Sequence, residues 1–93
     1  MKNGELRQKI RMAQAGAEAF PGIPVVEIAG DSRVLIENHL GILEYGYERV
    51  TVKLDYGRLY ICGNHLTMAQ MTKHQVVIRG IIQSVSIARG DDK

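Results

Sequence analysis

The sequence predicts a mainly β protein, with a small antiparallel sheet, sandwich or roll of about six or seven short strands after one N-terminal α-helix. The first observation behind this prediction is a change of period. Apolar residues recur every three or four positions up to Phe20 and every second position after Pro24. The second is that the alternating stretches are short and are separated by glycine, asparagine and aspartate, which favour turns.

Residues 1–20 have the pattern of an amphipathic helix, with a thin apolar stripe and several cations outside it. The stripe is Leu6, Ile10, Ala13, Ala17 and Phe20. Residues 21–24 then form a Pro/Gly linker, because two prolines prevent both a helix and a central strand. The segment is expected either to pack on the domain as a short helix or to act as an arm that docks on a partner or a membrane surface.

A β domain is predicted over residues 25–88, followed by a polar tail at 89–93. Short alternations fill most of it, and the longest apolar run, 76–87, is interrupted by Gly80. The alternating apolar residues are Val26 and Ile28; Val34 and Ile36; Val50, Val52 and Leu54; Leu59 and Ile61; and Leu66 and Met68, with a further strand from Ile42. Structural turns or corners are expected at Gly30, Gly57, Gly63 and Gly80.

A weak internal repeat leaves a second architecture open. The form Ile-x-Gly occurs at 28–30, 61–63 and 78–80, and each copy is followed by another apolar alternation. Three unevenly spaced copies are too few to establish a solenoid. A short β-solenoid therefore stays an alternative fold, as does an Sm-like barrel.

The stretch Val50–Cys62 predicts a β-hairpin with Tyr56-Gly57 as its two-residue loop. That loop would pair Leu54 with Leu59, Val52 with Ile61, and Thr51 with Cys62. The four apolar residues of this set would then lie on one face, with Cys62 on the other.

Cys62 and His65 have the spacing of half a zinc site. The chain has one cysteine and three histidines, and no second pair at metal-binding spacing. A nucleophilic cysteine would also need a base and an orienting group, and the sequence offers only His65 as a base. We therefore expect a turn at Gly63-Asn64 that carries His65, with no catalytic, cofactor-binding or metal-binding residue in the chain.

Composition argues against several classes of function. A net charge of +2 and an aromatic content of 5% give little support for nucleic-acid binding. No apolar run approaches the length of a membrane span, and the first residues lack a signal-peptide pattern. A single cysteine fits a reducing compartment. These features predict a cytoplasmic protein.

Residues 36–45, Ile-Glu-Asn-His-Leu-Gly-Ile-Leu-Glu-Tyr, form the most distinctive segment. From its residues alone it is the end of a strand, a polar corner and the start of a new strand. The segment closely resembles the YqfC branch of the YabP/YqfC family of sporulation proteins. The similarity runs from about Pro24 to Ile87 and includes the hairpin around Gly57, Gly63 with Leu66, and the closing Val76–Ile87. The family-signature residues are Ile36, Glu37, Asn38, His39, Leu40, Gly41 and Ile42.

The resemblance implies a small protein without known activity that takes part in endospore formation. It also implies a YqfD-like membrane sporulation protein as partner, and hence peripheral membrane association through that partner. We expect the signature residues, together with the N-terminal helix, to contact it. A homo-oligomer is compatible with this interpretation.

The sequence is compatible with three functions. The favoured one is a non-enzymatic adaptor or assembly protein that acts through protein contacts. The second is an Sm-like RNA-binding protein, which the basic first segment and two later blocks resemble. Against it, the chain lacks the long bent strand and the Asp…Met-Asn loop of Sm proteins. The third is a small metal-dependent enzyme based on Cys62 and His65.

Overall fold

A computed structural model describes residues 22–90, so the helix predicted for residues 1–20 lies outside the described residues. The described part is mainly β, as the sequence predicts, and contains six strands and no helix. Among these residues, therefore, there is no helix with the length and apolar character needed to cross a membrane. The strands are β1 (Val25–Ala29), β2 (Arg33–Glu37), β3 (Gly41–Tyr45), β4 (Arg49–Leu54), β5 (Gly57–Met71) and β6 (Gln75–Arg89).

The six strands form one antiparallel sheet with the order β1-β2-β6-β5-β4-β3. This order is open, because β1 and β3 end the sheet and do not pair with each other over residues 22–90. Neither alternative architecture describes this sheet. A solenoid stacks parallel strands, and a barrel closes its edges.

Strands β5 and β6 are much longer than the sequence predicts, with 15 residues each. Two strands were expected, one around Leu59 and one around Leu66, and the structure joins them in β5. The prediction of a turn at Gly63-Asn64 is therefore wrong. Gly63 lies inside β5, where the register with β6 shifts, and further shifts follow before Thr67 and before Gln70. The sequence suggested that the chain lacks the long bent strand of Sm proteins. That expectation is wrong, because β5 and β6 are both long and bent.

Glycine makes the bend possible, because the backbones approach closely there. A Cβ atom added to Gly63 would lie 1.9 Å from the carbonyl oxygen of Ile81, closer than any side-chain carbon can come. Gly80 has a φ of 147°, and a Cβ there would lie 2.7 Å from the carbonyl oxygen of His65. Each glycine thus faces the bend of the opposite strand, and β5 and β6 turn together.

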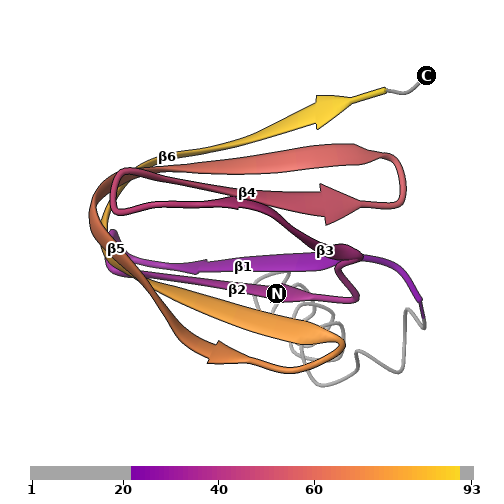
Figure 1. The fold of residues 1–93 in the computed structure, drawn as a ribbon, viewed down its shortest axis with the longest axis horizontal. Coiled ribbons are helices and arrows are strands. Elements are labelled where there is room, and N and C mark those ends of the chain that lie inside the picture. Colours follow the sequence, from indigo (N-terminus) through magenta and orange to yellow (C-terminus); the bar gives the residue numbers. More distant parts are fainter. Residues whose placement is uncertain (1–21, 91–93) are drawn as a thin grey trace, which may run out of the picture.

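The bend divides the sheet into two halves, which Figure 1 shows on either side of the curve in β5 and β6. Before its bend, β5 pairs with β4 and with the last half of β6. After the bend, the rest of β5 pairs with the first half of β6, which also pairs with β2. One half therefore contains β3 and β4, and the other contains β1 and β2.

Buried side chains from both halves form a single hydrophobic core. Alternate residues of β2 and β4 point into it, which is the period-2 pattern seen in the sequence. Val26 and Ile42 pack against its margins. The fully buried core residues are Val34, Ile36, Val50, Val52, Leu54, Leu59, Ile61, Leu66, Val76 and Ile78.

The β4–β5 hairpin forms, but its register differs by two residues from the predicted one. The loop is Asp55-Tyr56, so Leu54 pairs with Gly57 and Val52 with Leu59. Because side chains alternate with a period of two, a shift of two leaves every residue on the same face. The apolar face predicted for this hairpin is therefore confirmed although the pairing is not.

We predict that Leu59→Ala lowers the free energy of unfolding by roughly 2–4 kcal/mol, because Leu59 is 0% exposed at the centre of the core. Lys53→Ala, at an exposed position in the neighbouring strand, should change it by at most about 0.5 kcal/mol. Urea unfolding of both variants measures the difference. Equal losses would contradict this assignment of faces.

We also predict that Gly63→Ala destabilises the fold by about 2–3 kcal/mol, because the methyl group would force β5 away from the bend of β6. Gly46→Ala is the matched control, since its nearest neighbour, the Arg49 carbonyl oxygen, would be 3.6 Å away. Thermal unfolding of both variants checks this. A Gly63→Ala protein as stable as Gly46→Ala would show that the close approach is not needed.

Candidate functional site

The signature segment forms the corner between β2 and β3, and we call residues 38–40 the corner. Asn38 has a φ of 63°, in the left-handed region that asparagine tolerates better than most residues. Its backbone N–H donates to the carbonyl oxygen of His74 at 2.6 Å, and its side-chain Nδ2 donates to that of Ile23 at 2.8 Å. The first residues before β1 and the β5–β6 turn are thus both attached to the corner.

His39 lies at the centre of the corner, where it is only 6% exposed and connects two backbone segments. The backbone N–H of Gly41 donates to Nδ1 at 3.0 Å, so Nδ1 carries no proton in this arrangement. Nε2 therefore carries the proton and donates to the carbonyl oxygen of Thr72 at 3.3 Å. One neutral imidazole thus connects the start of β3 to the β5–β6 turn, 33 residues along the chain from His39.

The other signature residues have different surroundings. Ile36 is buried in the core, and Ile42 packs against it. The carboxylate of Glu37 accepts a hydrogen bond from Gln75 at 3.0 Å. Gly41 has a φ of 135°, a value that favours glycine where β3 begins. Most of this segment thus holds the fold together.

Leu40 is the exception, because it is 57% exposed at the tip of the corner. Its backbone is fixed, since its N–H donates to the carbonyl oxygen of Lys53 at 2.8 Å. Two other exposed apolar residues flank the corner. Ile23 accepts the Asn38 side-chain bond, and Met71 directly precedes Thr72. We call Ile23, Leu40 and Met71 the corner surface.

A shallow hollow adjoins this surface, lined by Glu37, Asn38, Thr72, His74 and Gln75. Most of its polar side chains already bond to one another or to the backbone, as in the Glu37–Gln75 pair, and the side chain of His74 is exposed. Within the corner, both ring nitrogens of His39 hydrogen-bond to backbone groups. The arrangement offers a rigid, partly apolar surface more readily than a reactive group.

Cys62 and His65 both lie in β5, on either side of its first register shift. Cys62 lies on the face of the sheet away from the core, opposite Arg49 and not Thr51. His65 is exposed, with a φ of 55° at the bend of β5. Over residues 22–90, no group of three or more His, Cys, Asp or Glu side chains is placed to hold a metal ion.

The remaining predicted turn glycines are placed as follows. Gly30 lies in the β1–β2 turn with a φ of 58°, and Gly57 is the first residue of β5. Gly80 lies inside β6 at the bend, so the corner expected there is a bend within one strand. Of these three glycines, only Gly30 lies between two strands.

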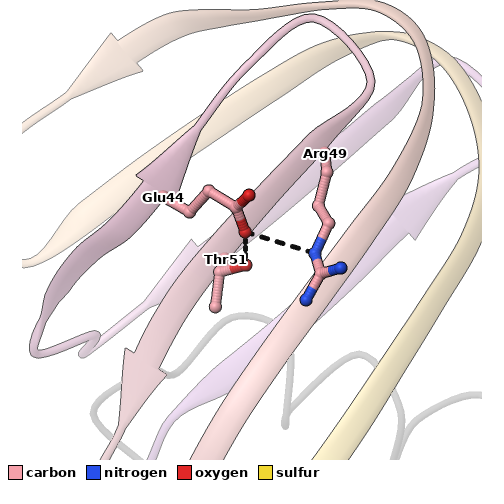
Figure 2. A network of polar contacts seen from close by, with 3 residues as sticks. All are labelled: Glu44, Arg49 and Thr51. Atoms are coloured by element: carbon pink, nitrogen blue, oxygen red, sulfur yellow. Dashed lines mark hydrogen bonds and ion pairs between the residues drawn. The ribbon is translucent and has the colours of Figure 1, made fainter.

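Sequence reasoning missed a polar cluster on the outer face of β3 and β4 (Figure 2). The Oε1 atom of Glu44 accepts a hydrogen bond from Oγ1 of Thr51 at 2.8 Å and pairs with Nε of Arg49 at 3.2 Å. The Arg49 guanidinium also lies over the ring of Tyr60, 4.7 Å from its centroid. The alternation of Arg49 and Thr51 along β4 could have indicated their shared face.

This cluster has a structural role. A register shift between Ile42 and Glu44 bulges β3, and the Glu44 contacts fasten the bulged strand to β4. The ion pair is about half exposed on both sides, so it contributes at most about 1 kcal/mol to stability. Its charges are satisfied by each other, which leaves the corner surface as the better candidate for function.

Comparison with known proteins gives one match. The model of the YabP family matches residues 24–93, a range that includes the corner and all six strands. No curated protein and no solved structure matches the chain.

We predict that His39→Ala lowers the free energy of unfolding by about 1–3 kcal/mol, because it leaves the Gly41 N–H and the Thr72 carbonyl without their partner. His74→Ala is the matched control. Its side chain is exposed, and its contribution to the corner comes from the backbone carbonyl, which alanine keeps. Chemical unfolding measures both, and equal stabilities would contradict the bracing role of His39.

Proposed function

The chain belongs to the YabP family, and on that premise we propose that it is a non-enzymatic sporulation protein that works as an adaptor or assembly component. In this proposal it belongs to the YqfC branch and acts in the cytoplasm, at the membrane surface of the sporulating cell. Its partner is a larger membrane sporulation protein resembling YqfD. Contact between the two proteins, and not a reaction, is its contribution.

The exposure of Leu40 on a fixed corner is the observation that carries this proposal. An exposed apolar side chain on a backbone that is already fixed loses less conformational entropy on binding, which favours it as an interface anchor. Hydrogen bonds through Asn38, His39 and Leu40 tie the corner to three other segments. The signature residues around Leu40 would thus serve the interface indirectly, by holding that leucine in place.

The start of the described residues supports the same surface. They begin at Gly22, and the neighbouring Ile23 bonds to the Asn38 side chain, so the described part of the chain begins directly beside the corner. Residues 1–20, which carry cations and an apolar stripe in sequence, precede it along the chain. We propose that this segment and the corner surface contact the same partner.

The test is capture of the YqfD-like protein from detergent-solubilised membranes of sporulating cells. Leu40→Ser should weaken capture about tenfold or more, because a buried leucine contributes about 1.5–3 kcal/mol and each 1.4 kcal/mol is a factor of ten. The substitution leaves the backbone bond to Lys53 in place, so the domain should stay folded.

Leu43→Ser is the matched control, since Leu43 is similarly exposed but lies in the bulge of β3. It should leave capture unchanged. His39 is left intact because it is buried and its loss would disturb the fold. Normal capture by a folded Leu40→Ser protein would exclude the corner surface from the interface.

A further inference from the structure

The last half of β6 forms an edge of the sheet that differs from the others. Strand β2 pairs with β6 only as far as Arg79. Beyond the bend, residues 81–89 pair with β5 on one side, and within residues 22–90 no strand pairs with the other side. Figure 1 shows this segment, in yellow, along the outer margin of the ribbon.

The alternation of backbone hydrogen bonds identifies the groups that point outward. The N–H of Gly90 donates to the carbonyl oxygen of Tyr56 at 2.9 Å, which places Gly90 in a hydrogen-bonded position toward β5. In an antiparallel ladder every second residue has this orientation, so Ser86 faces β5. The N–H and C=O groups of Val85 and Ile87 therefore point away from the sheet.

The start of this edge is capped by the protein itself. The N–H of Ile82 donates to the carbonyl oxygen of Asp31, in the β1–β2 turn, at 2.7 Å. This bond ends the access of any added strand near Ile82. The available edge is thus the segment from about Gln83 to Arg89.

From Ser84 to Ala88 this edge lacks the features that keep sheet edges from pairing, since the bulge of β6 opposite Gly63 falls at Gln83. Proteins protect edges with charges, prolines, bulges or short strands. β3 is bulged and carries Glu44, and β1 has five residues including Glu27. From Ile81 to Ala88 the β6 edge has no charged residue and no proline.

We propose that this edge pairs with the same edge of a second copy of the chain, antiparallel about a twofold axis at Ser86. Val85 of each copy then lies opposite Ile87 of the other, and their outward backbone groups bond in pairs. Val85 already packs against the core, whereas Ile87 is 54% exposed. Pairing covers Ile87 and continues the apolar inner face of the sheet across the axis.

The segment is suited to its own copy by charge and by symmetry. It has an apolar residue on each side of Ser86, as a twofold axis requires of a self-complementary surface. Its single charge, on Arg89, falls opposite Gln83, so no like charges meet. The pairing uses neither the corner nor residues 1–20 and is independent of the proposed function.

The oligomeric state of the full chain tests the proposal by light scattering after size-exclusion chromatography. The wild type should have twice the mass of the chain, and Ile87→Lys should halve it by placing two cations in the interface. Ile28→Lys is the matched control, because Ile28 is also 54% exposed and lies on the opposite edge strand, β1. Ile28→Lys should stay dimeric. A monomeric wild type, or a dimer lost with Ile28→Lys, would overturn the proposal.

Cross-linking tests the register without depending on the stability of Ile87→Lys. In a Cys62→Ser background, Ser86→Cys places two thiols at a non-hydrogen-bonded pair, with Cα atoms about 4.5 Å apart, which a disulfide can bridge. Ser84→Cys, also exposed, lies opposite Ala88, and its two thiols are about 13 Å apart along the strands. Oxidation should link the first variant and leave the second monomeric in a denaturing gel. Equal linking of both, or of neither, would overturn the pairing.

Discussion

The structure depends on the close approach of two backbones where β5 and β6 bend together. Gly63 lies against the carbonyl of Ile81, and Gly80 lies against that of His65, so neither position has room for a side-chain carbon. This approach lets two long strands turn in register and fold one sheet into two halves. The halves can then share a single core, which a flat sheet of this size could bury on neither face without another layer.

The bend also explains why the two surfaces of interest exist. Each long strand pairs with a second neighbour on one side of the bend only, β6 with β2 before it and β5 with β4 before it. An unpaired length of β6 follows directly from that arrangement. At the far end of the folded sheet, the β5–β6 turn comes to lie beside the β2–β3 corner, where His39 bonds to Thr72. Residues 36–42 thus mostly connect these two turns, and Leu40 is left exposed.

The sequence predicted what depends on local alternation. The β class, the positions of β1 to β4 and the inward face of the β4–β5 hairpin follow from a period of two, and the face was unaffected by a register error of two residues. It could not predict that Gly63 continues a strand. Locally, Gly-Asn has the composition of a turn, and only the approach of Ile81 from the other strand makes it a bend. The burial of His39 likewise depends on Thr72, far along the chain, and the Glu44 cluster depends on a bulge.

The bend brings β2 and β4 into one core. If the same six strands formed a flat sheet, β2 and β4 would be separated by three interstrand distances, or about 14 Å. Protons that far apart give no nuclear Overhauser effect. The most direct test is methyl NOE spectroscopy of the full chain with labelled isoleucine, leucine and valine. We expect cross-peaks that join Val34 or Ile36 to Val50 or Val52, because all four lie in the shared core. Cross-peaks only between neighbouring strands would contradict it.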